Sequence, residues 1–282
     1  MYTVAASACL LLYLVGSSTE LACVIAIIGK TDWLQKPELI LIVSLGLTDL
    51  LGSYGFALGI ATSLAGLEPN WLLSHFVGFT NNLGWAAGSV HLTLLAVNRL
   101  VAVVTPLRYD LIFTASFSQH LSVGCWLAGL VVWTGNALLC CPVVFVWQQV
   151  TCVYVFPQEA IFPQWIQVNF FLNLLTISVS LVCYVVLSVK LLYLRFVDQS
   201  LGGIDVSLCF QFFLITLVYI VNTVAWNLVG VLGSGYWIMS SVTSALYFTI
   251  NGYVYVLFNK IIRKAMKDSF LKAETRVYPI RT

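Results

Sequence analysis

The residues that most often carry enzyme chemistry are few in this chain and do not cluster. Its three histidines, His75, His91 and His120, form no i, i+4 pair that could hold a metal ion on one helix face. The segment Gly46-Leu47-Thr48-Asp49 differs from the Gly-x-Gly-Asp motif of intramembrane aspartyl proteases, and no partner aspartate lies in another apolar segment. A Gly-x-Ser-x-Gly nucleophile turn is missing. We therefore expect no catalytic residues and no metal site.

Two acidic residues, Glu20 and Asp49, lie inside long apolar segments. An ionisable side chain in a membrane costs about 2.5–3.5 kcal/mol on insertion scales, so each one is a functional candidate. The alternative is a simple hydrogen bond to a neighbouring helix. If the two carboxyl groups face each other, repulsion should leave at least one of them protonated. A transporter or channel normally needs several such groups along a path.

The composition decides the class of protein. Hydrophobic residues make up 60% of the 282 residues and charged residues 9%, against roughly 45–50% and about 25% in soluble domains. A soluble protein could not cover its surface with so few polar groups, and disorder, coiled coil and a nucleic-acid-binding surface are excluded as well. The formal net charge of +2 implies no acidic partner. We expect an integral membrane protein.

Seven apolar segments are long enough to cross a bilayer as helices, which takes about 20 residues. They are too long for the roughly 9–11-residue strands of an outer-membrane barrel. The chain therefore predicts one all-α domain over residues 1–282. Its expected spans are about 4–28, 38–66, 75–104, 119–146, 161–190, 206–232 and 237–258.

The basic residues predict how these spans are oriented. With seven spans, all 13 Lys and Arg fall on the side that holds the loops after spans 1, 3 and 5 and the C-terminal tail. Because positive residues are retained in the cytoplasm, the N-terminus is expected outside and the tail inside. A count of six or eight spans would destroy this separation.

The inner end of the third span carries the most informative motif, Asn98-Arg99-Leu100 followed by Pro106-Leu107-Arg108-Tyr109. It resembles the rhodopsin-like G-protein-coupled receptors, whose third span ends in Asp/Glu-Arg-Tyr before a Pro-Leu-x-Tyr loop. Four further landmarks of that family fall in order over essentially the whole chain: Asp49 in the second span, Trp126 in the fourth, Trp226 in the sixth and Asn251-Gly252-Tyr253-Val254-Tyr255 in the seventh.

The departures from the family pattern indicate a subfamily. Asn98 replaces the acidic residue, Leu100 the tyrosine and Gly252 the proline, and Leu228 stands where the sixth-span proline is expected. This degenerate pattern is similar to the nematode serpentine chemoreceptors, class X or a relative. The resemblance implies a multi-pass receptor of the plasma membrane.

The resemblance implies a switch at Arg99, which meets a heterotrimeric G protein when the receptor is activated. The alternative is an arginine that snorkels and marks topology. Asn98 cannot give the charge-assisted restraint of an acid, so we expect a weaker resting lock. Tyr184 and Tyr255 resemble the tyrosines that swing toward this arginine, and Asn251 belongs to the same seventh-span motif.

The outer half of the bundle is expected to bind the ligand, because it is concave, apolar and open to the exterior. Asn81, Asn82 and Trp85 can line it, with Trp226 at its floor. Asn81 aligns with the aspartate that binds amines in related receptors, so an uncharged or weakly polar small molecule fits better than a cation. Ordinary hydrogen bonding between helices is the alternative for the two asparagines.

No cofactor is expected, and sodium coordination stays open. Oxygen ligands suit sodium, and Asp49 matches the family's sodium-binding aspartate. Gly88, however, stands where a third-span serine is usual, and Glu20 roughly where a first-span asparagine is usual.

The family's usual disulfide cannot form, because no cysteine lies between Cys23 and Cys125. Cys152, in the second outer loop, is expected to pair with Cys140 or Cys141, and the sequence does not choose between them. The remaining cysteines lie within spans and are expected to be packing residues: Cys9, Cys23, Cys125, Cys183 and Cys209.

A short amphipathic helix is expected at about 259–271, resembling the family's eighth helix. Apolar residues fall on one face and Lys260, Arg263, Lys264 and Lys267 on another, so the helix would lie on anionic lipid. A plain basic tail is the alternative.

The sequence thus predicts a chemosensory receptor that binds a small molecule outside and activates a G protein inside. Two alternatives stay open: a seven-span transporter or channel, and a decayed receptor that no longer signals.

Overall fold

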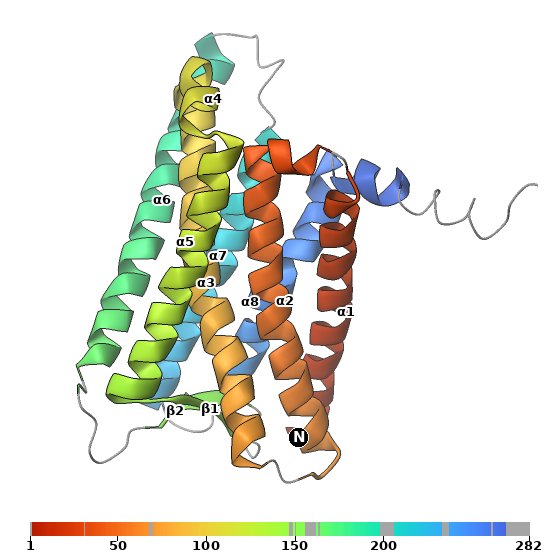
Figure 1. The fold of residues 1–282 in the computed structure, drawn as a ribbon, viewed down its shortest axis with the longest axis vertical. Coiled ribbons are helices and arrows are strands. Elements are labelled where there is room, and N and C mark those ends of the chain that lie inside the picture. The colour runs from red at the N-terminus through yellow and green to blue at the C-terminus, as the bar shows by residue number, and fades with distance from the viewer. Residues whose placement is uncertain are drawn as a thin grey trace, which may run out of the picture.

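The computed structural model is an all-α bundle with one small β-hairpin at one end (Figure 1). It describes residues 2–30, 32–67, 70–146, 149, 151–155, 162, 164–197, 206–232, 237–260 and 262–268. The side chains of Arg195, Cys209 and Leu228 lie outside this description, as does Phe270.

Long helices dominate the described part of the chain and run roughly along one axis (Figure 1). Their bounds are Tyr2–Ile28 (α1), Pro37–Leu64 (α2), Trp71–Val104 (α3), Ala115–Gly135 (α5), Trp165–Val197 (α6), Val206–Leu232 (α7) and Trp237–Phe258 (α8). Among the described residues, α1, α2, α3, α5 with the following turn, and α6 are long and apolar enough to cross a membrane. α7 contributes the shorter apolar stretch Phe213–Trp226. The all-α membrane bundle expected from the sequence is confirmed.

Local capping explains where several helices begin. Asn70 accepts a hydrogen bond from the Leu73 amide at 2.8 Å, so α3 starts at Trp71. Thr114 caps α5 in the same way through the amide of Phe117, at 3.2 Å. α2 starts at Pro37, whose missing N–H costs nothing in the first turn.

Shorter elements connect the long helices. They are the 3₁₀ turns Trp33–Gln35 (η1) and Pro106–Arg108 (η2), the single turn Tyr109–Ile112 (α4), the π turn Asn136–Cys140 (η3) and the strands Val143–Val146 (β1) and Thr151–Tyr154 (β2).

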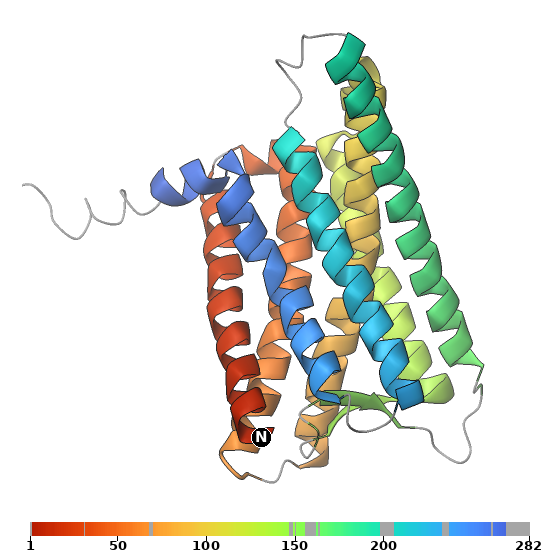
Figure 2. The ribbon, with the colours of Figure 1, turned by 180° about the vertical axis from the view of Figure 1, so that it is seen from behind.

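The fourth span is shorter than the sequence suggested. It was expected to reach residue 146, but α5 ends at Gly135, η3 ends at Cys140 and β1 follows. Pro142 has no backbone N–H to continue a helix, and the valines after it favour a strand. β1 pairs with β2 in antiparallel register, with Phe145 opposite Cys152. Figure 2 shows this hairpin crossing the end of the bundle at which the N-terminus lies.

Small residues let the helices approach closely, as membrane helices require. A Cβ at Gly84 of α3 would lie only 2.7 Å from the Thr48 carbonyl oxygen of α2. Gly16 of α1 packs against Thr249 of α8 in the same manner. The outward faces carry large exposed apolar side chains, notably along α6, as expected of helices that face lipid.

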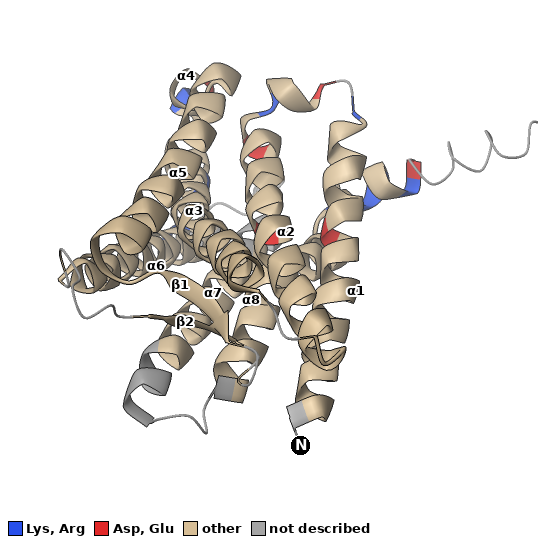
Figure 3. Cartoon of the chain, turned by 60° about the horizontal axis from the view of Figure 1, so that its bottom comes forward, with Lys and Arg blue, Asp and Glu red and all other residues tan. Residues whose placement is uncertain are grey.

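The described basic residues gather at one end of the bundle. Figure 3 shows them after α1, on the turns after α3 and in the segment after α8. This end lies opposite the hairpin, and Glu20 and Asp49 are buried between the two ends.

The segment after α8 is helical at residues 260 and 262–268, which covers the described part of the expected amphipathic helix. Ile262 and Ala265 are buried, whereas Lys260 and Arg263 are exposed. Asn259 caps this turn by accepting from the Ile262 amide at 3.1 Å. The two-faced character predicted from the sequence is present in these residues.

Candidate functional site

The C-terminal end of α3 is tied to the turn that follows it. The side-chain amide of Asn98, which is fully buried, donates a hydrogen bond to the hydroxyl of Tyr109 at 3.0 Å. Tyr109 opens the short helix α4, and its ring stacks on Phe113. Asn98 therefore holds the Pro-Leu-x-Tyr turn against the bundle.

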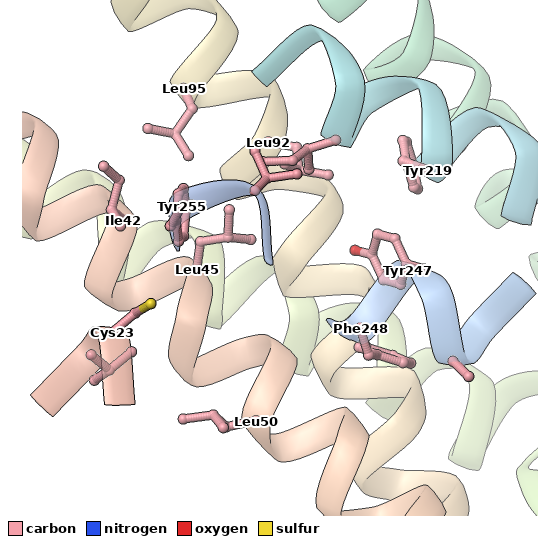
Figure 4. Packing of buried hydrophobic residues seen from close by; sticks show 14 of the residues in the cluster. Cys23, Ile42, Leu45, Leu50, Leu92, Leu95, Tyr219, Tyr247, Phe248 and Tyr255 are labelled. Atoms are coloured by element: carbon pink, nitrogen blue, oxygen red, sulfur yellow. The ribbon is translucent and has the colours of Figure 1, made fainter. Parts of the chain in front are cut away.

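Arg99 is half-buried beside this contact and interacts electrostatically with Tyr255 of α8. Tyr255 is fully buried, and Figure 4 shows its ring among Leu45 of α2 and Leu95 of α3. The structure thus brings together two residues that the sequence assigned to one switch. Tyr184, on α6, is also buried, with its ring 6.1 Å from that of Phe213 on α7.

The acidic residues Glu20 and Asp49 come together between α1, α2 and α8. They interact electrostatically, and the Asn251 amide donates a hydrogen bond to Asp49 Oδ2. Gly46 of α2 and Gly252 of α8 both lie against Glu20. The seventh-span motif is therefore part of the same polar region as the second-span aspartate.

The space where the sequence left sodium binding open is crowded on the α3 side. A Cβ at Gly88 would lie 2.7 Å from the Tyr247 hydroxyl and 3.2 Å from Thr48 Oγ1. Tyr247 is fully buried and packs against Phe248 and Tyr219 (Figure 4). The missing third-span serine is thus replaced by a large ring and not by an open cavity.

The half of the bundle nearer the β-hairpin contains a ladder of buried amides across three helices. Asn136 Nδ2 donates to Asn82 Oδ1 at 3.2 Å, and Asn169 donates to Asn136 Oδ1. Tyr154 of the hairpin hydrogen-bonds Asn82 as well. Asn81 is buried beside this ladder, and Trp85 is half-buried on the same helix.

A second polar chain connects α6, α7 and α8. The Tyr219 hydroxyl donates to Asn173 Oδ1 at 3.2 Å and lies 3.1 Å from Thr176 Oγ1. Further along α7, the indole N–H of Trp226 donates to Ser244 Oγ at 2.8 Å. Ser244 donates in turn to Asn222 Oδ1 at 3.2 Å.

Comparison with protein families accounts for this arrangement. Residues 22–262 match the model of the 7 transmembrane receptor (rhodopsin family). The chain belongs to this family. No curated protein is significantly similar to it. Membership agrees with the buried second-span aspartate, the third-span arginine and the seventh-span tyrosine described above, and members of this family are typically receptors and not enzymes.

The structure of this rhodopsin-family chain also contains a polar contact that the sequence analysis missed. Ser44 Oγ lies 2.7 Å from His91 Nε2, and the indole N–H of Trp126 donates to the same oxygen at 3.1 Å. His91 Nδ1 lies 2.8 Å from the Ala87 carbonyl oxygen, which makes it the donor nitrogen. Trp126 was recognised as a landmark, but nothing in the one-dimensional pattern pointed to its partners.

The disulfide differs from the expected pairing. Cys140 is bonded to Cys141, and Cys152 is a free, fully buried thiol. The hairpin register places Cys152 on β2 opposite Phe145, and its thiol interacts with Tyr13 of α1. Cys140 is the last residue of the π turn η3, and Cys141 follows it before the hairpin begins. Burial raises the pKa of the Cys152 thiol well above its usual range.

The cysteines expected in the spans fall on described side chains with one exception. Four of the five cysteines expected in the spans are buried, and the fifth, Cys209, lies outside the described side chains. Within the described ranges no three His, Cys, Asp or Glu side chains group closely enough to hold a metal ion.

Proposed function

We propose that this rhodopsin-family receptor is chemosensory, binds an uncharged or weakly polar small molecule in its outer half, and activates a heterotrimeric G protein at its inner end. The observation that carries the proposal is the Asn98–Tyr109 hydrogen bond, next to which Arg99 interacts electrostatically with the buried Tyr255. An arginine that follows a neutral amide in the sequence, where the family has an acid, is a residue that can change partners when the helices move.

The coupling step follows from how Arg99 is restrained. Asn98 has no charge to attract the guanidinium, and its amide is committed to Tyr109. Opening of the inner ends of α6 and α7 would free Arg99 to meet a G-protein surface, and Tyr184 and Tyr255 would follow it. Ligand and G protein then influence each other through the populations of two bundle states.

The chemistry of the outer half supports a neutral ligand. The described polar side chains there are mostly amides and hydroxyls, including Asn81, Asn82 and Asn136. Amides supply both donors and acceptors but no charge with which to hold a cation. Trp226 is half-buried and donates a hydrogen bond to Ser244. Its ring would form the floor of the ligand site and respond to ligand binding.

We further propose that the receptor lies in the plasma membrane with its N-terminus outside. The clustering of described Lys and Arg at the end opposite the hairpin supports this orientation. An antibody against a C-terminal tag should label cells only after permeabilisation, and labelling of intact cells would reverse the assignment.

The nematode chemoreceptor relationship also remains a proposal, and it is supported by the Asn98-Arg99 pair and by Gly252 in place of proline. It favours small environmental molecules over peptides or large proteins as ligands.

Expression in cells with a G-protein readout, screened against a library of small molecules, tests the proposal. We expect a ligand-dependent signal that Arg99→Ala abolishes and that Arg108→Ala, an exposed arginine of the following turn, retains. Flux of a substrate that persists in Arg99→Ala would favour a transporter or channel. A well-expressed chain that is silent toward every ligand and every G protein would favour a decayed receptor.

A further inference from the structure

The inner half of the bundle contains two acidic side chains that the proposed signalling steps leave unused. Glu20 of α1 is 1% exposed and Asp49 of α2 is 0% exposed. Each carboxyl group interacts electrostatically with the other. Two uncompensated carboxylates in so dry a place would be very costly, because burial strips them of water. Something must reduce the charge of this pair.

Two glycines from different helices enclose the Glu20 carboxyl group. A Cβ at Gly46 of α2 would lie 2.6 Å from Glu20 Oε1. A Cβ at Gly252 of α8 would lie 3.0 Å from Oε2 and 2.7 Å from the Glu20 backbone nitrogen. Gly252 stands where the family has a proline, so this departure provides the room that Glu20 occupies.

Several buried polar atoms around the pair have no hydrogen-bond partner among the described residues. They include both Glu20 oxygens and Asp49 Oδ1. Asn251 is 2% exposed and reaches Asp49 with its amide nitrogen, yet its own Oδ1 is unpartnered too. Asn251 thus donates one hydrogen bond, to Asp49 Oδ2, and the other oxygens of this group have no donor among the described residues, which indicates a bound positive species.

The neighbouring titratable groups do not supply that charge. Cys23 on α1 interacts with Glu20, and Tyr247 on α8 interacts with Asp49. Tyr255 on α8 interacts with both acids and with Arg99 of α3. Thiols and phenols are neutral near pH 7. Tyr255 also connects the pair with the arginine of the proposed switch.

A metal ion fits this place less well than a proton. Hard cations such as Ca²⁺ take about six to eight oxygen ligands. On the α3 side there is no room for a further side-chain ligand at position 88, because a Cβ at Gly88 would already lie 2.7 Å from the Tyr247 hydroxyl. A proton needs neither space nor further ligands.

We propose that Glu20 and Asp49 form a binding site for one proton between α1, α2 and α8, so that the buried pair carries a single negative charge. The proton is bound to one carboxylate oxygen and leaves as H⁺ to water when the bundle opens or unfolds. The site does not depend on G-protein coupling. Its consequence for signalling, through Tyr255 and Arg99, does rest on the proposed function.

The sign of the pH effect follows from linkage. In the unfolded chain both carboxyl groups are ionised above about pH 5. The folded bundle then holds one proton more than the unfolded chain, so its stability falls as the pH rises. The unfolding equilibrium constant should rise by up to about tenfold per pH unit while the proton is retained.

Infrared spectroscopy of the full-length receptor in detergent tests the site directly. At neutral pH the wild type should show the C=O stretch of a protonated carboxyl group, shifted in D₂O. The double variant Glu20→Gln/Asp49→Asn should lose this band, and Glu38→Gln, a control on the same helix as Asp49, should keep it. A wild type without the band, or a double variant that retains it, would overturn the proposal.

Two further arms keep the test decisive. If the double variant does not fold, ¹³C-labelled glutamate or aspartate in the wild type assigns the band, and no shift with either label refutes the site. Replacing choline chloride with sodium chloride at equal ionic strength should leave the band unchanged, whereas its loss would identify a sodium site instead. Neither readout needs a G protein, so a failure of the proposed signalling function would be seen separately.

Discussion

The buried amide of Asn98 donates a hydrogen bond of 3.0 Å to the hydroxyl of Tyr109, eleven positions along the chain. This contact joins the end of α3 to the first residue of α4. Asn98 stands where the family has an acid. Arg99 therefore follows an uncharged residue in the sequence. Under the proposed function, the resting restraint at this end of the bundle would be a neutral hydrogen bond, which is weaker than a charge-assisted one.

The first prediction concerns basal signalling. Asn98→Asp should lower ligand-free G-protein activation by about tenfold, since a charge-assisted restraint adds on the order of 1.4 kcal/mol. Tyr109→Phe should raise ligand-free activation, because it removes the hydroxyl that accepts the hydrogen bond from Asn98. Tyr54→Phe, at an exposed tyrosine on α2, serves as the control. Nucleotide exchange at matched surface expression is the measurement, and an unchanged or higher signal in Asn98→Asp would contradict this interpretation.

The second prediction concerns the contact among Ser44, His91 and Trp126. Trp126→Phe keeps most of the ring but removes the N–H that donates to Ser44 Oγ at 3.1 Å. We expect a loss of about 1–2 kcal/mol in the free energy of unfolding, as for a buried hydrogen bond. Trp71→Phe, at an exposed tryptophan, should have little effect. Thermal melting in detergent measures both, and equal melting temperatures would argue against the bond.

The third prediction uses two helix glycines with opposite surroundings. Gly84→Ala should destabilise the receptor by about 1–3 kcal/mol, because its Cβ would lie 2.7 Å from a backbone oxygen of α2. Gly124→Ala should be neutral or slightly stabilising, since nothing lies within 4 Å of its Cβ. Melting curves of the two variants, recorded in the same detergent, should therefore separate. Two superimposable curves would show that α2 and α3 do not approach this closely.

The fourth prediction concerns Cys152. Burial raises the pKa of its thiol, so the reactive thiolate is scarce near neutral pH. A membrane-impermeant maleimide applied to intact cells should not label Cys152. In the denatured receptor the peptide that contains Cys152 should be labelled, and Cys152→Ser should lose the label from that peptide alone, because the other free cysteines still react. Reduction should break the Cys140–Cys141 disulfide and add two thiols that label after denaturation, since both residues are buried in the native receptor. Rapid labelling of native Cys152 would show that the hairpin does not cover it.

Much of the fold could be predicted from the sequence because membrane insertion is governed by local composition. Apolar length predicted the helices, and the boundaries of α2, α7 and α8 fall within two residues of the expected ones. The fourth span was wrong at its end, because the apolar run Val143–Val146 fits a buried strand as well as a helix. Hydropathy does not distinguish the two, and Pro142 decided the outcome.

The sequence by itself determined the family, through Asp49, Arg99 and Tyr255 placed one per span, and it determined the separation of basic from apolar segments. Only the tertiary structure decided which side chains meet. It brought Glu20 between Gly46 and Gly252, filled the space beside Gly88 with Tyr247, and joined Cys140 to Cys141. Such contacts depend on how helices distant in the chain rotate and approach one another, and packing sets those angles where no local pattern records them.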